Sequence, residues 1–431
     1  MALIKYFKNP KKIVYLPLLE RIQSDDEQVK SAVMNIMEDV KKNGDKALFE
    51  YERRFDGSDL TSLFVSEEEF IEAEKSVDDE LKAAIDRAYK NIYTFHEKQK
   101  TNGEAVETEK GVRCFRKVVP ISRVGLYIPG GTAPLFSTVL MLSIPAKVAG
   151  CKKITLATPA RGGKVNPVVL YTAKRCGVDR VLKCGGSQAI AALCYRTESV
   201  EKVDKIFGPG NRYVAFAKNI ASNVCAIDMV AGPSEVMVVC DEFADPLFVA
   251  TDLLSQAEHG KDSQVMLVIK AKDSQMADEI YSNVEKCLDE ELKKLGRKEF
   301  MLPSLSHSAA FSFFNNEDVI EIINSYAPEH LIINTQDPYE ILEGVESAGS
   351  VFIGQYSPES AGDYASGTNH TLPTSGRATS SSGVSLDSFI KKITVQELTK
   401  EGIKSLAPTI IKMAEAEELT AHAEAARVRM K

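Results

Sequence analysis

Apolar side chains recur every three or four residues over the first part of the chain, which is the spacing of amphipathic helices. The first such stretch runs from Val29 to Val40 and is followed by Asn43-Gly44. We therefore expect one helix that ends there and a second helix over roughly 45–55. Residues 78–98 repeat the spacing, with His96 beside the apolar stripe. This segment predicts a longer helix in which His96 is structural.

Beyond residue 110, short apolar runs alternate with helical segments. The runs occupy 124–128, 153–157, 180–183, 205–207, 236–240, 264–269, 331–334 and 350–353. Strands that alternate with helices are typical of a mostly parallel sheet with helices on its faces. The pattern therefore predicts an α/β protein, with a mainly helical tail from 386 onward.

Three glycine-bearing turns, at 129–131, 185–186 and 208–210, follow three of these predicted strands. Parallel sheets bind ligands at the carboxyl ends of their strands, so the turns favour a nucleotide site. None completes the G-x-G-x-x-G fingerprint, because Tyr213 stands where the third glycine would be. The residues alone leave open whether the glycines bind a ligand or only shape turns.

Residues 252–260 read as the last turns of a helix, which Gly260 is expected to end in a left-handed conformation. Gln256 and His259 are three residues apart and would share one face of this helix. An amide oxygen and an imidazole on one face can hold a divalent metal. Alternatively, His259 only stabilises the helix C-terminus and Gln256 is solvated.

Other side chains suited to catalysis lie further along the chain. Glu329 and His330 are adjacent before a predicted strand, and such a pair suits acid–base chemistry near neutral pH. Asp363 and His370 share a polar loop. Two imidazoles, one carboxylate and one amide would form a donor set that suits zinc, with cobalt or manganese as substitutes: Gln256, His259, Asp363 and His422.

Composition narrows the class of protein. The net charge is −8 and the basic residues are scattered, which argues against nucleic acid and anionic membranes as partners. No apolar run reaches transmembrane length, and the N-terminus lacks a signal-peptide core. The eight cysteines form no C-x-x-C, so we expect reduced thiols in a cytoplasmic protein. None lies in the stretches suited to catalysis, which weakens a cysteine-nucleophile mechanism.

Eight ordered motifs identify a family resemblance. They are GLYIPGG at 125–131, GSQAIAA at 186–192, KIFGPGN at 205–211, AGPSE at 231–235, LSQAEH at 254–259, APEHL at 327–331, GDYASGTNH at 362–370 and EELTAH at 417–422. Over nearly its full length the chain resembles the histidinol dehydrogenases. No position that this family uses for chemistry departs from the pattern.

The resemblance implies two related, incomplete Rossmann-type domains with parallel sheets. Residues 127–234 would form an inserted domain that carries the NAD groove. Residues 24–126 and 235–378 would together form the domain with the zinc and acid–base residues. Residues 1–23 would be a helical segment, and residues 379–431 a helical arm at the dimer contact.

The resemblance also implies a zinc-dependent oxidation of L-histidinol to L-histidine by two NAD in succession, through bound histidinal. Zinc would be held by Gln256, His259, Asp363 and His422, and Glu329 and His330 would be the acid–base pair. The cofactor groove would include Tyr127, Gln188 and Asn211. Substrate would contact Ser234, Glu417, His370, His330 and the zinc ligands. In the implied homodimer, His422 reaches the partner's site.

Other functions fit parts of the pattern. A related zinc- and NAD-dependent enzyme could oxidise another small polar alcohol, although Glu417 and His370 suit an imidazole-amine substrate. A zinc hydrolase needs only the metal and Glu329, and leaves the three glycine turns unexplained. A non-catalytic zinc-binding scaffold would close the metal's coordination sphere with protein ligands and show no turnover.

Overall fold

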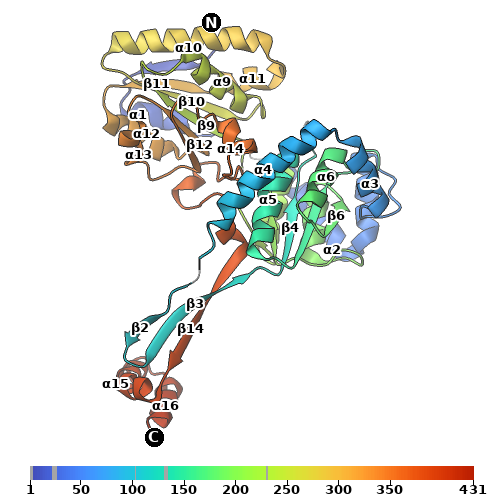
Figure 1. Cartoon of the computed structure of the whole chain (residues 1–431), viewed down its shortest axis with the longest axis vertical. Coiled ribbons are helices and arrows are strands. Elements are labelled where there is room, and N and C mark those ends of the chain that lie inside the picture. Colours follow the sequence, from blue (N-terminus) through green and yellow to red (C-terminus); the bar gives the residue numbers. More distant parts are fainter. Residues whose placement is uncertain (1–2, 22–26, 102, 131–133, 230–231) are drawn as a thin grey trace.

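The computed structural model describes residues 3–21, 27–101, 103–130, 134–229 and 232–431. Residue 131, the last of the predicted turn at 129–131, and residue 231, the first of the AGPSE motif, lie outside the described residues. Figure 1 shows two bodies built on separate sheets and a narrow ribbon that leads away from them to a helical tip. The predicted α/β class with parallel sheets is confirmed. None of the described helices has the length and apolarity needed to cross a membrane.

The first body contains a five-stranded parallel sheet in the order β6-β5-β4-β7-β8. Its strands are β4 (Arg123–Tyr127), β5 (Lys153–Thr158), β6 (Arg180–Lys183), β7 (Lys205–Phe207) and β8 (Ala226–Ile227). The helices between them are α5 (Phe136–Ala149), α6 (Pro167–Arg175), α7 (Gly186–Tyr195) and α8 (Arg212–Ala221). Helices cover both faces of the sheet, which explains why its strands read as continuous apolar runs.

The second body contains a six-stranded parallel sheet in the order β1-β11-β10-β9-β12-β13. Its strands are β1 (Lys5–Lys8), β9 (Glu235–Cys240), β10 (Gln264–Lys270), β11 (Ala309–Phe313), β12 (His330–Asn334) and β13 (Ser350–Ile353). Its helices are α9 (Pro246–Ala257), α10 (Ser274–Lys294), α11 (Lys298–Ser306), α12 (Asn316–Tyr326), α13 (Pro338–Leu342) and α14 (Glu359–Tyr364). Side chains of β9 alternate between the two faces: Val236 and Val238 pack with α9, α10 and α11, and Met237 packs with α12.

Three N-terminal helices pack on the five-stranded body: α2 (Glu27–Asp56), α3 (Glu67–Ser76) and α4 (Asp79–Glu97). Helix α2 lies against α7 and α8, α3 against α6, and α4 against α5. Gly44 interrupts α2 with a backbone φ of 53°, at the predicted break. This packing differs from the prediction that 24–126 shares a domain with 235–378. An amphipathic stripe shows that a helix is buried on one face and does not specify which sheet covers it.

The N-terminal segment also differs from the helical piece predicted for 1–23. Residues Lys5–Lys8 form strand β1, which pairs in parallel with β11, and a short helix α1 (Lys12–Tyr15) follows. Tyr15 is buried on the α12 face of the six-stranded sheet. The pairing joins residues about 300 positions apart, a contact that no local pattern indicates.

The ribbon is a three-stranded antiparallel sheet of β2 (Val106–Glu109), β3 (Val112–Pro120) and β14 (Ile390–Leu398). Two helices, α15 (Lys400–Ala416) and α16 (Thr420–Arg427), pack on each other at its far end (Figure 1). We call residues 390–431 the arm. The helical prediction for 379–431 is correct for α15 and α16 and wrong for β14, whose mostly exposed side chains gave no apolar signal.

Candidate active site

A cavity of about 620 Å³ is lined by residues of both bodies. Ser234, Ser263 and Glu329 directly precede strands β9, β10 and β12, so the six-stranded sheet presents its amino end to the cavity. The five-stranded sheet contributes Asn211, which follows β7 and therefore lies at a carboxyl end. The cavity thus lies where the ends of two parallel sheets meet, a position that brings together loops distant in sequence.

Glu329 and His330 lie at the start of β12 and are both buried. Nδ1 of His330 is 3.6 Å from Oε2 of Glu329, and its Nε2 is 3.4 Å from Oδ1 of Asp363. Oε2 of Glu329 accepts a hydrogen bond from the backbone N–H of Glu235 at 2.9 Å. The pair is therefore held by the backbone of β9 and by α14.

Burial and neighbouring charge shift the proton affinities of this pair. Burial raises the pKa of Glu329 to about 8, because its charged form loses solvation. Burial lowers the proton affinity of His330, but the carboxylates of Glu329, Glu359 and Asp363 outweigh it and raise the pKa of His330 to about 10. Strongly shifted acids and bases inside a cavity are typical of catalytic sites.

The predicted metal ligands of the body lie together. Gln256 is buried on α9, and its Nε2 donates to the carbonyl of Glu235 at 3.0 Å. Its Oε1 has no hydrogen-bond partner among the described residues. His259 and Asp363 line the cavity beside it. Helix α9 ends at Ala257 rather than at Gly260, and Gly260 lacks the expected left-handed backbone. His259 therefore follows the helix instead of lying in its last turn.

Glu359 is a residue that the sequence interpretation missed. It lies four positions before Asp363 on α14, and its side chain is 1% exposed. Ligand atoms of His259, Glu359 and Asp363 all lie within 4.8 Å of one another. The sequence interpretation placed Asp363 in a loop, where the four-residue spacing has no meaning. On a helix that spacing puts both carboxylates on one face, and this signal could have found Glu359.

Ser234 and His370 also line the cavity. His370 is held on both sides: Nε2 is 3.1 Å from Oγ1 of Thr138, and Nδ1 is 2.9 Å from the carbonyl of Asp363. Desolvation lowers the pKa of His370, which favours its neutral form. The two bodies are thereby linked through this side chain at the cavity wall.

The three predicted cofactor residues lie in different environments. Asn211 lines the cavity and caps α8 by accepting from the N–H of Val214. Tyr127 and Gln188 are buried below the glycine turns. The hydroxyl of Tyr127 accepts from the N–H of Gly186, and Nε2 of Gln188 donates to Oε1 of Glu52. Tyr127 therefore holds the turn that opens α7 directly. Gln188 instead ties α7 to Glu52 of α2, whose Oε1 also accepts from the N–H of Gly185 in that turn.

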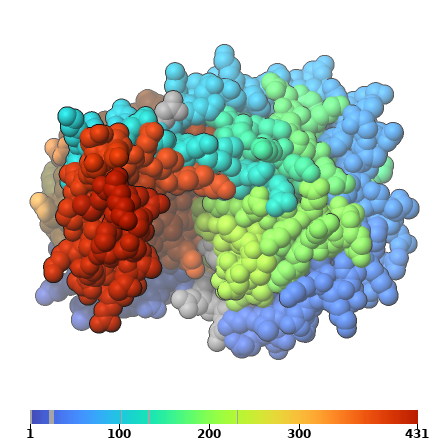
Figure 2. Space-filling view, turned by 90° about the horizontal axis from the view of Figure 1, so that it is seen from below, coloured from blue at the N-terminus to red at the C-terminus, as the bar shows by residue number. Residues whose placement is uncertain are grey.

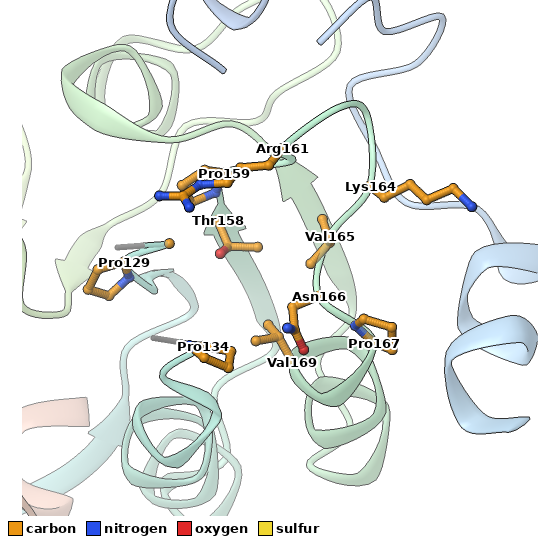
Figure 3. Close-up of a pocket in the computed structure, with 11 residues that line it drawn as sticks. Pro129, Pro134, Thr158, Pro159, Arg161, Lys164, Val165, Asn166, Pro167 and Val169 are labelled. Carbon is orange, nitrogen blue, oxygen red and sulfur yellow. The ribbon is translucent and has the colours of Figure 1, made fainter. Parts of the chain in front are cut away.

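A second cavity extends this edge of the five-stranded sheet (Figure 3). It lies beyond β5 and beside the start of α6, where Pro159, Arg161 and Asn166 line it. Pro129 lines both cavities. The turns after β4, β5 and β7 thus line two neighbouring cavities along one edge of the sheet. Gly208 has a φ of 120°, and a Cβ there would lie 2.1 Å from the carbonyl oxygen of Tyr127, so this turn requires glycine.

Glu417 and His422 are not brought to the cavity of their own chain. Glu417 is the C-cap residue of α15 and His422 lies in α16. Both are exposed at the tip of the arm. Figure 2, seen from below, shows the helices of the arm as a separate lobe in front of the bodies. One chain therefore brings six predicted site residues to the cavity: Asn211, Ser234, His259, Glu329, His330 and Asp363, with His370 in its wall. Gln256 is buried beside His330, Tyr127 and Gln188 are buried away from the cavity lining, and neither residue of the arm reaches it.

Comparisons with known proteins identify the family of the chain. A family model described as histidinol dehydrogenase matches residues 19–430. The chain belongs to the histidinol dehydrogenase family. The predicted family and the prediction of an enzyme are thus both confirmed.

Individual members of the histidinol dehydrogenase family match along the whole length. A histidinol dehydrogenase of Bacteroides fragilis is 52% identical over 432 residues, covering 100% of this chain and 99% of the relative. One of Campylobacter jejuni is 50% identical, covering 94% of each chain. A crystal structure of histidinol dehydrogenase from Elizabethkingia anophelis has a TM-score of 0.96 at 50% identity, covering 100% of this chain and 98% of that chain. The arm therefore belongs to the fold of this family.

Proposed function

We propose that the chain catalyses the zinc-dependent oxidation of L-histidinol to L-histidine by two NAD in succession, through bound L-histidinal, at the end of histidine biosynthesis. One observation carries the proposal. A single cavity holds the buried Glu329–His330 pair, the donors His259 and Asp363, and the Asn211 turn at the edge of the five-stranded sheet. Acid–base groups, metal donors and a nucleotide-type turn thus meet around one space.

The donor set fits zinc. The amide of Gln256 is oriented by its bond to the carbonyl of Glu235, which leaves Oε1 buried and without a partner among the described residues. Gln256, His259 and Asp363 would hold the ion together with His422. When bound, zinc supplies a Lewis acid that anchors an imidazole or amine and a positive charge that offsets the carboxylates around His330. The own-chain residues provide a nitrogen and two oxygens, which are zinc donors.

The cofactor proposal rests on the turns of the five-stranded body. NAD would lie along the carboxyl ends of β4, β5 and β7, with Tyr127, Gln188 and Asn211 defining the groove. When bound, NAD accepts hydride from the substrate carbon. Asn211 lines the same cavity as His330, so the nicotinamide end can approach the acid–base pair.

Substrate recognition uses residues from the bodies and the arm. Ser234, His370, His330 and the three body ligands surround the cavity or its floor, and Glu417 and His422 would close it. Histidinol carries an imidazole and an amine, which match a zinc ion and neighbouring carboxylates. Holding the alcohol carbon in one orientation turns two hydride transfers into steps within one complex.

When bound, zinc would offset the carboxylates that raise the pKa of His330. The neutral imidazole of His330 would then take the hydroxyl proton as hydride leaves the alcohol carbon. The second oxidation needs an aldehyde hydrate, because hydride must leave a carbon that bears two oxygens. Glu329 activates that water and then holds its proton, a role suited to a carboxyl whose pKa is raised to about 8. None of the eight free cysteines lines the cavity, so the chemistry uses no thiol.

The active unit we propose is a homodimer in which His422 of each arm enters the partner's cavity. A two-fold arrangement would complete both sites by the same exchange. The free thiols support a reducing compartment, and we propose the cytoplasm.

The test is an assay of purified protein with zinc, NAD and L-histidinol. The proposal predicts two NADH per histidine formed, loss of turnover after chelation, and an unchanged circular dichroism spectrum in the metal-free protein. Full activity without metal would refute the zinc assignment. Product without NADH would indicate a zinc hydrolase, and NADH only with another polar alcohol would indicate a related dehydrogenase.

A further inference from the structure

Glu359 is a buried carboxylate that the proposed mechanism does not use. It lies in the first turn of α14, with 1% of its surface exposed. Its Oε2 has no hydrogen-bond partner in the part of the chain that the structure describes. Burying an unpaired carboxylate costs roughly several kcal/mol of solvation free energy, unless a cation or a hydrogen-bond donor compensates the charge.

The surroundings of Glu359 make the need for a cation stronger. Asp363, Glu329 and Asp252 all disfavour its charged form, and burial does so most. His330 provides a positive charge nearby, but it already lies between Glu329 and Asp363. More acidic than basic groups therefore surround one buried point, an arrangement that a divalent ion would balance.

Geometry shows where such an ion would lie. One ligand atom each of His259, Glu359 and Asp363 falls within 4.8 Å of the others, close enough for all three to reach one ion. Oε1 of Gln256, also buried without a partner among the described residues, adds a further oxygen from α9. Side chains from two elements thus supply the donors without any contribution from the arm.

We propose that Glu359 is a metal contact of this site, and that His259, Glu359 and Asp363 let one chain hold the ion before His422 of a partner arrives. The inference rests on the proposed zinc function. It divides the metal ligands into two groups. Those on the six-stranded body bind the ion first, and His422 of the partner's arm completes the coordination. Metal binding would then depend on Glu359 even where the arm is absent from the cavity.

The experiment compares Glu359→Gln with Asp252→Asn in the full-length protein. Asp252 is the matched control. Burial raises the pKa of its carboxyl group to about 7, and it lies close to Glu359. It is not one of the three residues whose ligand atoms cluster. Zinc affinity is measured by competition with a coloured chelator. Coordination is measured from the visible absorption of the cobalt-substituted protein.

The proposal expects Glu359→Gln to weaken zinc binding by about 10²-fold or more and to shift the cobalt bands, with both unchanged in Asp252→Asn. His422→Ala should retain one zinc per subunit, and the double variant Glu359→Gln/His422→Ala should lose it. If the glutamine variant does not fold, Glu359→Asp, which keeps the carboxylate, is used in its place. It should retain zinc with shifted cobalt bands.

Two results would overturn the inference. Unchanged affinity and spectrum in Glu359→Gln would remove Glu359 from the metal site. An equal loss in Asp252→Asn would show a general effect of buried charge. A wild-type protein that binds neither zinc nor cobalt would instead refute the proposed function, so the two failures are distinguishable.

Discussion

Several predicted site residues of the two bodies are buried, whereas those of the arm are exposed. In the bodies, Gln256, Glu329 and His330 are buried and held by the backbone of β9. In the arm, Glu417 and His422 are exposed at the end of a ribbon. Among the described residues, the bodies have buried oxygen and nitrogen atoms without a hydrogen-bond partner, such as Oε1 of Gln256. The arm exposes a residue that we propose as a metal ligand, and neither Glu417 nor His422 lines the cavity of its own chain.

The surface of the arm supports the same contrast. Met413 is 61% exposed and Leu419 is 44% exposed, although both are apolar. Figures 1 and 2 agree that the arm projects from the bodies. Much of the surface of both side chains therefore stays exposed within their own chain. Exposed apolar side chains beside polar functional residues are typical of an interface. The difference between the regions supports our proposal that the bodies of one chain hold most of the site and that an arm supplies the rest.

The largest effect is expected from the arm. His422→Ala should lower kcat/KM by about 10³-fold or more, because it removes a metal and substrate contact. The melting temperature should not change, because the side chain is exposed. Steady-state assays and calorimetry check both points, and sedimentation verifies that the variant still forms dimers. Wild-type turnover in a folded dimer would contradict a role for the arm in the site.

In the body, His330→Asn should slow both oxidations by about 10²-fold or more, because it removes the proton acceptor. His96→Asn is a matched control. His96 is also a buried histidine, but its Nδ1 is 2.8 Å from the carbonyl of Ile92 within α4. This control should lower the melting temperature while kcat stays near the wild-type value. Equal losses of kcat in the two variants would contradict a specific role for His330.

A smaller and selective effect is expected for Glu329→Gln. Water enters only in the second oxidation, so the variant should slow oxidation of added histidinal more than oxidation of histidinol to the aldehyde. Single-turnover measurements of NADH formation separate the two half-reactions. The same factor in both would contradict the water-activating role and leave Glu329 as a group that only orients His330.

The smallest effect concerns stability and pH. Burial raises the pKa of Glu52 to about 7 in the folded protein, whereas the unfolded chain titrates near its ordinary value of 4.5. The folded state therefore keeps a proton that the unfolded state releases, and stability should fall as pH rises from about 4.5 to 7. The loss is on the order of 3 kcal/mol. This pH-dependent loss of stability should be smaller in Glu52→Gln.

The arm provides the control for this pH effect. Glu415 pairs with Arg427 at 2.7 Å on an exposed surface, so Glu415→Gln should leave the pH dependence unchanged. Melting temperatures between pH 4.5 and 7.5 measure the comparison. The same slope in Glu52→Gln as in the wild type would show that Glu52 ionises normally in the folded protein.

The sequence predicts local elements well and nonlocal pairing poorly. The apolar runs of β9 and β10 and the amphipathic stripe of α4 are local signals, and the structure has these elements where they were expected. Strands β1 and β14 pair with partners about 300 and 280 residues away. Neither strand has the apolar pattern of a buried strand. Which sheet α2 packs against also depends on contacts between residues distant in sequence.

The same division applies to the site. Several motifs contain residues that line the cavity. Ser234 and Glu329 precede strands, His330 begins β12 and Asn211 caps α8, so these side chains lie at the ends of elements. The Glu359–Asp363 spacing was informative only once the segment was known to be a helix. The motifs also could not show that Tyr127 bonds to the α7 turn and Gln188 to Glu52 of α2, while Asn211 faces the cavity. Those roles depend on side-chain direction in the folded protein.

The central claim is that the arm completes a site in a second chain. Heterodimers of His330→Asn and His422→Ala chains, isolated through two different tags, test it directly. With crossed arms, one site combines the intact body of the His422→Ala chain with the intact arm of the His330→Asn chain. Its activity should be about half that of the wild-type dimer.

A wild-type chain paired with a His330→Asn/His422→Ala chain is the matched control, because it carries the same two changes on one chain. With crossed arms, each of its sites has one lesion, and this heterodimer should be inactive. The account therefore predicts activity in the first heterodimer and none in the second. The reverse result, with both heterodimers verified, would show that each arm serves its own chain and would contradict the account.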